Sequence, residues 1–76
     1  MIEHIKGMFS KMNDATRTQA LDLLRSEFQL KSAKEARNSW IIGGRIPLEN
    51  QQKISELFKQ LLEIQDVQVK EILVHF

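Results

Sequence analysis

Residues 30–47 read LKSAKEARNSWIIGGRIP and contain the only Trp, the only Pro and two of the three glycines of the chain. Ser32 is a favoured N-cap residue, so we expect a helix to begin directly after it. Ala33, Ala36 and Trp40 fall on one face of that helix, which suits packing against a core. The opposite face is mostly polar and carries Lys34, Arg37, Asn38 and Ile41. The sequence therefore predicts a helix with one face for the core and one for a partner.

Glycine and proline concentrate at one joint. Gly43 and Gly44 favour the end of the preceding helix, and Pro47 suits the first residue of the next one. The rest of the chain shows helical periodicity without repeats or a low-complexity linker, so residues 1–76 are predicted to form one all-α domain. The first three helices are expected to carry residues 2–12, 15–28 and 33–42, and the fourth to begin at Pro47.

Apolar residues recur at helical spacing and predict the core. The first helix contributes Ile2, Ile5, Met8, Phe9 and Met12, the second Ala20, Leu21, Leu23, Leu24 and Phe28, and the fourth Ile54, Leu57, Phe58, Leu61 and Leu62. Asn13 or Asp14 is expected to end the first helix and cap the second. Glu49 suits the positive end of the fourth helix.

The C-terminal residues 67–76 fit two kinds of structure. Helical spacing relates Val69, Ile72, Leu73 and Phe76, with Asp66 as a cap, whereas strand-like alternation relates Val67 to Val69 and then Ile72 to Val74 and Phe76. The domain is thus predicted to have four or five helices, or four helices and a C-terminal strand. Either element leaves an apolar face, which we expect to pair two copies of the chain as a homodimer.

The formal net charge of +1 hides an uneven distribution. Residues 25–45 carry a surplus of three positive charges, whereas residues 46–76 are negative by two. A cationic surface around one candidate helix is typical of a phosphate-binding element. Arg and Asn side chains also suit bidentate pairing with guanine and adenine edges in a major groove. The charge pattern therefore indicates double-stranded DNA as a partner.

Other classes of site find little support. The chain has no Cys, which excludes a disulfide framework, a thiolate zinc site and a thiol nucleophile. His4 and His75 stand at opposite ends without metal-ligand spacing, and the carboxylates are spread along solvated helix faces. We expect no enzymatic activity, no cofactor, no metal and no small-molecule substrate.

The apolar runs are too short to span a bilayer. Glu3 and Lys6 interrupt the N-terminal segment where a signal peptide needs an apolar core. We therefore expect a soluble protein that does not enter a membrane, and a cytoplasmic location is the simpler assumption.

A family resemblance rests on FQL at residues 28–30, on Ser32 and on WIIGGRIP at residues 40–47. These motifs, with the following helix, resemble the small helix-turn-helix domains of phage Cro and repressor proteins and their bacterial relatives, over about half of the chain. The resemblance implies a sequence-specific DNA-binding regulator of transcription, in which Phe28 and Leu30 pack between helices and Ser32 caps the recognition helix. It also implies that Ala36 and Trp40 anchor that helix.

Three positions differ from the family pattern. Gln29 stands at a turn position usually filled by Gly and needs a positive φ if the turn keeps its geometry. Lys31 adds one residue before the cap, which lengthens the turn. Arg25 occupies a position in the second helix that commonly holds a small Ala.

The residues expected to contact DNA divide into two groups. Lys34, Glu35, Arg37 and Asn38 face the bases, with Glu35 able to accept a hydrogen bond from cytosine. Lys31, Ser32 and Arg45 are expected at the phosphate backbone. For Lys34, Arg37 and Asn38 the alternative is a solvated helix face. Glu35 is alternatively a surface charge, and Ser32 acts first of all as a cap. At the level of function, the alternative is a helical protein–protein interaction module, an adaptor or antagonist whose apolar C-terminal segment docks on another protein without DNA binding.

Overall fold

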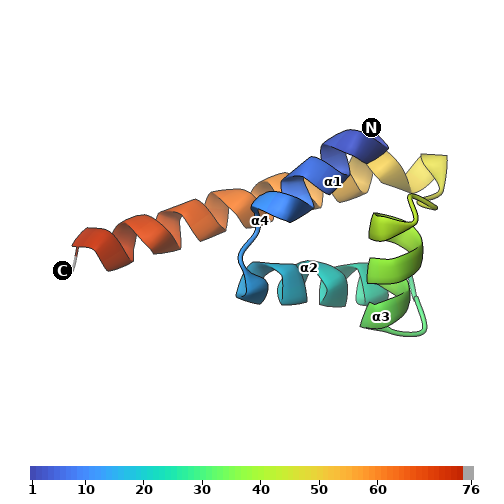
Figure 1. Ribbon diagram of the computed structural model, residues 1–76, viewed down its shortest axis with the longest axis horizontal. Helices are drawn as coiled ribbons and strands as arrows, with labels where there is room; N and C mark the ends of the chain where they lie inside the picture. Colours follow the sequence, from blue (N-terminus) through green and yellow to red (C-terminus); the bar gives the residue numbers. More distant parts are fainter. Residues whose placement is uncertain (75–76) are drawn as a thin grey trace.

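The computed structural model describes the backbone of residues 1–74 and the side chains of residues 1–68, and each regular element there is helical. The elements are α1 (Ile2–Lys11), α2 (Asp14–Glu27), α3 (Ala33–Glu35), η1 (Ala36–Ile42) and α4 (Leu48–Val74). Helix α1 and helix α2 both pack on α4, and the α3–η1 segment packs across α2 and α1 at one end of the molecule (Figure 1). The all-α prediction is confirmed.

The core lies where these helices meet. Its largest fully buried side chains are Ile5 of α1, Leu24 of α2, and Ile54 and Phe58 of α4. The ring of Phe9 stacks on Phe58 with a centroid distance of 6.2 Å. Most of the predicted apolar stripes of the first, second and fourth helices therefore form the core, because each stripe follows the helical period. Ile2 and Leu57 are only half-buried and do not belong to it.

The α1–α2 turn is held by two side chains. Asn13 caps α2, since its Oδ1 atom accepts a hydrogen bond from the Thr16 N–H at 2.9 Å, as the sequence predicts. Gln65 of α4 reaches the same turn with both ends of its amide: Oε1 accepts from the Asn13 N–H at 2.7 Å, and Nε2 donates to the Lys11 carbonyl at 3.2 Å. The turn is thereby tied to α4.

The α2–α3 turn contains a residue in the left-handed region. Gln29 has φ +55°, and the Leu30 N–H donates to the Arg25 carbonyl at 3.0 Å, which is the hydrogen bond of a Schellman C-cap. Gln29 thus occupies the conformation that glycine would adopt there. The Arg25 side chain is exposed and does not separate the helices.

The η1 segment is π-helical and changes which residues face the core. The Gly43 N–H donates to the Asn38 carbonyl, five residues back, at 2.9 Å. Each turn therefore holds more residues than an α-helical turn. This geometry turns Ile41, like Ala36, toward the core, and Ile41 is only 3% exposed. The sequence prediction that Ile41 lies on the polar face is wrong for this reason, and Ile42, 58% exposed, lies outside instead.

The glycine joint ends η1 as predicted. Gly44 has φ +67°, and a Cβ atom at Gly43 would lie 2.7 Å from the Ser39 carbonyl oxygen, so the close π-helical turn requires glycine there. Helix α4 begins at Leu48, one residue later than expected, because Pro47 serves as the residue before the first turn; its carbonyl accepts from the Asn50 N–H at 2.9 Å.

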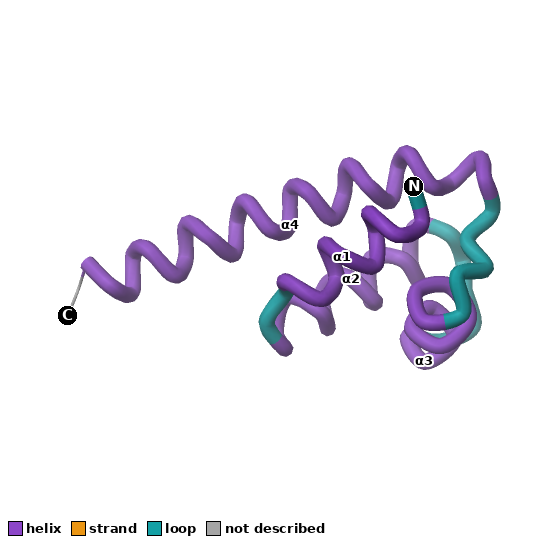
Figure 2. The backbone as a smooth tube through the Cα atoms, turned by 45° about the horizontal axis from the view of Figure 1, so that its top comes forward, coloured by secondary structure: helices purple, strands orange, loops and turns teal. Residues whose placement is uncertain are grey.

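Helix α4 continues without a break to Val74, and its last turns, after Gln65, extend beyond α1 and α2 (Figure 2). Asp66 lies inside the helix and does not cap a separate one, since no Gly or Pro interrupts residues 48–74. Within residues 1–74 there is no separate helix after α4 and no strand. Of the predicted pairing element 67–76, the side chains from residue 69 onward lie outside the described residues.

Candidate nucleic-acid interface

The packing of the α3–η1 segment fixes which face it presents. Ala36 is fully buried and Trp40 is nearly so, as the sequence predicts. The Trp40 ring packs on the Phe28 ring with a centroid distance of 5.3 Å and an interplanar angle of 48°. Two large rings in contact resist rotation of the segment about its own axis. The opposite face therefore points consistently to solvent.

The start of α3 is held by Ser32 and Glu35 in a variant of the capping box, in which the Glu35 carboxylate binds the residue before the N-cap. The Ser32 Oγ atom accepts from the Glu35 N–H at 3.1 Å, which confirms Ser32 as the N-cap. The Glu35 carboxylate in turn accepts from the Lys31 N–H at 2.9 Å. Glu35 therefore uses a carboxylate oxygen within the turn, a role that the sequence analysis missed although the Ser-x-x-Glu spacing of a capping box signals it.

Six of the seven predicted contact residues are exposed, and Glu35 is half-buried. The exposed ones are Lys31, Ser32, Lys34, Arg37, Asn38 and Arg45. The one ion pair found among the described residues joins Lys53 to Glu27 and involves none of them. The four cations among them lie within residues 31–45, and this concentration of positive charge favours a polyanionic ligand.

The cationic surface continues from η1 toward the start of α2. Arg37 lines an open hollow of about 330 Å³ whose other walls are formed by Phe9, Asp14, Arg17, Thr18 and Leu21. Arg17 is oriented by α1, because its guanidinium donates to the carbonyls of Phe9 and Ser10 at 3.1 and 3.0 Å. A second guanidinium is thereby held beside Arg37 by the fold, and Asp14 is the acidic residue of this hollow.

A further cation lies at the glycine joint that ends η1. The Lys6 Nζ atom of α1 lies 3.7 Å from the position that a Cβ atom on Gly44 would take, so the ammonium group packs over the glycine joint. The sequence does not indicate Lys6, because only tertiary packing brings α1 to this joint. A cation far away along the chain is thereby brought to the glycine that precedes Arg45.

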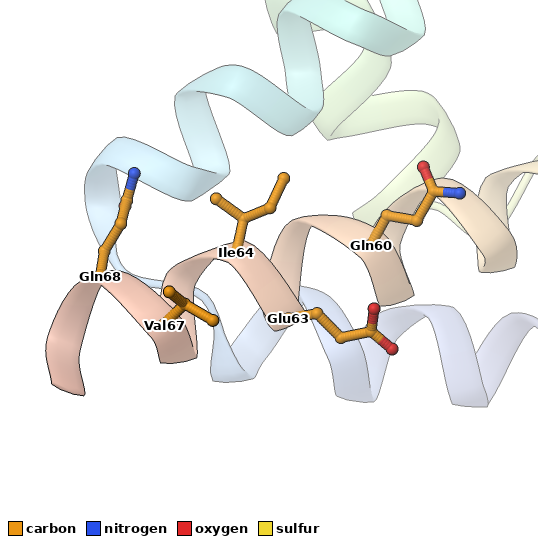
Figure 3. A pocket seen from close by; sticks show the side chains of 5 residues that line it. All are labelled: Gln60, Glu63, Ile64, Val67 and Gln68. Atoms are coloured by element: carbon orange, nitrogen blue, oxygen red, sulfur yellow. The ribbon is translucent and has the colours of Figure 1, made fainter. Parts of the chain in front are cut away.

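The second half of α4 forms another exposed surface. Gln60, Glu63, Ile64, Val67 and Gln68 line an open hollow of about 530 Å³ (Figure 3). Ile64 and Val67 are 53% and 54% exposed, which is high for aliphatic side chains three residues apart on one helix. This surface is apolar at its centre and is separate from the cationic one.

Sites of other kinds find no support in the part of the chain that the structure describes. No cluster of three or more His, Asp or Glu side chains there could hold a metal ion. None of the described helices combines the length and the apolar character needed to cross a membrane. In comparisons with known proteins, no family model, curated protein or solved structure matches this chain. The functional interpretation is therefore built on the two exposed surfaces.

Proposed function

We propose that this chain is a sequence-specific DNA-binding protein of the helix-turn-helix type, in which α2 supports the α3–η1 segment and that segment enters the major groove. The observation that carries the proposal is the division of the segment into two faces. Ala36 and Trp40 are buried against the body, while Lys34, Arg37 and Asn38 are exposed on the other side. A helix mounted in this way offers cationic and amide groups to base edges.

Within this proposal each side chain has a chemical role. Arg37 and Asn38 form hydrogen bonds with the edges of purine bases. Lys34, one turn earlier, also faces the bases. Lys31 and Arg45, at the two ends of the segment, bind backbone phosphates and set its register on the duplex. The Ser32 hydroxyl accepts from the Glu35 N–H and keeps its own proton to donate to a phosphate oxygen.

In this proposal Glu35 mainly stabilises the start of α3, whereas its position in the sequence indicates a contact with cytosine. Its carboxylate accepts from the Lys31 N–H and so stabilises the start of α3. Its contribution to DNA binding is then to fix the turn that presents Lys31. A contact with cytosine would use the remaining carboxylate oxygen.

The proposal extends to a homodimeric regulator of transcription of the phage repressor type, located in the cytoplasm where it meets its operator. Support for pairing comes from Ile64 and Val67, which are exposed on α4 on either side of Gln65. A two-fold dimer would place two α3–η1 segments about 34 Å apart on one side of the duplex. Each half-site then needs only modest affinity.

The decisive experiment measures binding of the intact chain to random duplex DNA as a function of salt, followed by selection of bound sequences. The proposal expects a linear fall of log affinity with log salt and an enriched inverted repeat. Lys31→Ala, which removes a proposed phosphate contact, should reduce the salt slope by about one unit. Lys59→Ala removes one positive charge from an exposed position on α4 and serves as the matched control.

A second candidate function rests on the apolar hollow around Ile64 and Val67, which favours a protein–protein interaction module. Absence of DNA binding at low salt would reject the DNA-binding proposal and favour this alternative. The two functions are separable by mutation, because the cationic surface and the apolar surface share no residue.

A further inference from the structure

Ile42 is the aliphatic side chain on the exposed face of the α3–η1 segment. It is 58% exposed, whereas its neighbour Ile41 is 3% exposed. An α-helix would place Ile41 one turn after Arg37, on the polar face. In η1 the hydrogen bonding is π-helical, as the 2.9 Å bond from the Gly43 N–H to the Asn38 carbonyl shows. Ile41 is therefore buried, and Ile42 is exposed in its place.

The same geometry sets the neighbours of Ile42. It follows Arg37 by five residues and Asn38 by four, so in a π-helical turn it lies next to both on the exposed face. Arg45, also exposed, follows after the glycine joint. Ile42 therefore extends the surface proposed to read base edges, and it adds an apolar group to a set that is otherwise cationic or amide.

We infer that Ile42 is a specificity-determining residue that recognises the C5-methyl group of a thymine in the major groove. The inference deepens the proposed function and rests on it. Among the groups that base pairs present in the major groove, the thymine methyl is the apolar one, and aliphatic side chains pack on it. An isoleucine beside Arg37 and Asn38 thus complements a thymine next to the purines that those residues read.

The contact has a definite expected size. Burial of one methyl group of this kind contributes about 0.8 kcal/mol, which corresponds to a change of about fourfold in affinity. We therefore expect that, in the selected DNA sequence, the methyl group of one thymine in each half-site contributes this amount to the binding affinity. Uracil keeps the pairing and the O4 acceptor of thymine and lacks only that methyl.

The test uses the intact chain and the DNA sequence selected from a random pool. Each thymine of that sequence is replaced by uracil in turn, and the affinity is measured for the unchanged protein, Ile42→Ala, Ile42→Val and Leu48→Ala. Leu48 is the matched control, since it is an exposed aliphatic residue, 81% exposed, at the start of α4 and outside the segment.

The unchanged protein and Leu48→Ala should lose about fourfold in affinity at one thymine of the half-site. Ile42→Ala should bind the thymine and uracil forms equally well, and Ile42→Val should keep most of the difference. DNA binding with no uracil effect at any position, or with an effect that persists in Ile42→Ala, would overturn the inference alone. No binding to the random pool at low salt would overturn the DNA-binding proposal and this inference together.

Discussion

The rings of Phe28 and Trp40 pack against each other across the turn that follows α2, with centroids 5.3 Å apart. Phe28 is the C-cap residue of α2 and Trp40 lies near the end of η1, so one aromatic contact joins the two halves of the proposed DNA-binding unit. Lys53 of α4 adds a cation 5.7 Å from the Phe28 ring centre and pairs with Glu27 at 3.2 Å. The orientation of the exposed face depends on this cluster.

Trp40→Ala should therefore destabilise the fold of the domain even in the absence of DNA. Truncation of a buried aromatic side chain costs about 3–5 kcal/mol, which is comparable to the whole stability of a small domain. Chemical denaturation followed by circular dichroism, without DNA, measures the loss. If Trp40→Ala keeps the stability of the unchanged protein and loses only DNA binding, Trp40 is a contact residue and its assignment to the core is wrong.

Arg37→Ala and Asn38→Ala should leave the fold intact and weaken binding to the selected DNA sequence. Both side chains are exposed, and each bidentate base contact contributes about 1–3 kcal/mol of discrimination. Arg45→Ala should instead weaken all DNA sequences to a similar extent, because a phosphate contact carries no sequence information. Competition between selected and random duplexes distinguishes the two effects. Unchanged affinity in all three variants would remove this surface from the proposal.

Gln29→Gly should stabilise the protein. The left-handed conformation of Gln29, with φ +55°, costs an L-residue about 1 kcal/mol, and glycine adopts it without that penalty. The greater freedom of glycine in the unfolded chain offsets part of the gain, so an increase of a few tenths to about 1 kcal/mol is expected. Gln29→Val should lower the stability, since a β-branched residue is strained there. Equal denaturation midpoints for the glycine and valine variants would contradict the turn geometry.

Local chemistry accounts for what the sequence predicts correctly. Asn13 and Ser32 cap their helices through side chains that act within three residues, and the buried stripes follow from periodicity. The side of the segment on which Ile41 and Ile42 lie could not be predicted in the same way. That side depends on the π-helical turn of η1, which the glycine at position 43 permits. A prediction that assumes the α-helical period at every residue cannot include such a turn.

Tertiary contacts account for the remaining differences. Gln65 binds the backbone of the α1–α2 turn, which lies more than fifty residues earlier in the chain. The Asp66 that follows Gln65 resembles a helix cap in sequence, yet α4 continues through it. Likewise, the packing of Lys6 over Gly44 brings a cation of α1 to the glycine joint, and no local pattern indicates it.

Gln65→Ala should lower the stability modestly without changing the fold. The variant loses the hydrogen bonds to the Asn13 N–H and the Lys11 carbonyl, both of which can then bind water because these contacts are exposed. A loss of about 0.5–1.5 kcal/mol for each hydrogen bond is expected. Hydrogen exchange should show faster exchange of the Asn13 amide in particular. Gln60→Ala, on the same helix and without such a bond, provides the control.

The last prediction concerns assembly through the second half of α4. Ile64 and Val67 are exposed at the centre of the apolar hollow, and burial of both in a partner would remove that surface from water. Replacement of both by Ser, or deletion of residues 67–76, should convert a dimer into a monomer with much weaker operator binding. Both changes remove the Val67 side chain, but the Ser replacements keep the whole helix, so a monomer in both cases separates loss of pairing from local unfolding. Light scattering of the intact chain, alone and with DNA, is the critical measurement. A strictly monomeric protein at high micromolar concentration in both states would rule out the dimer.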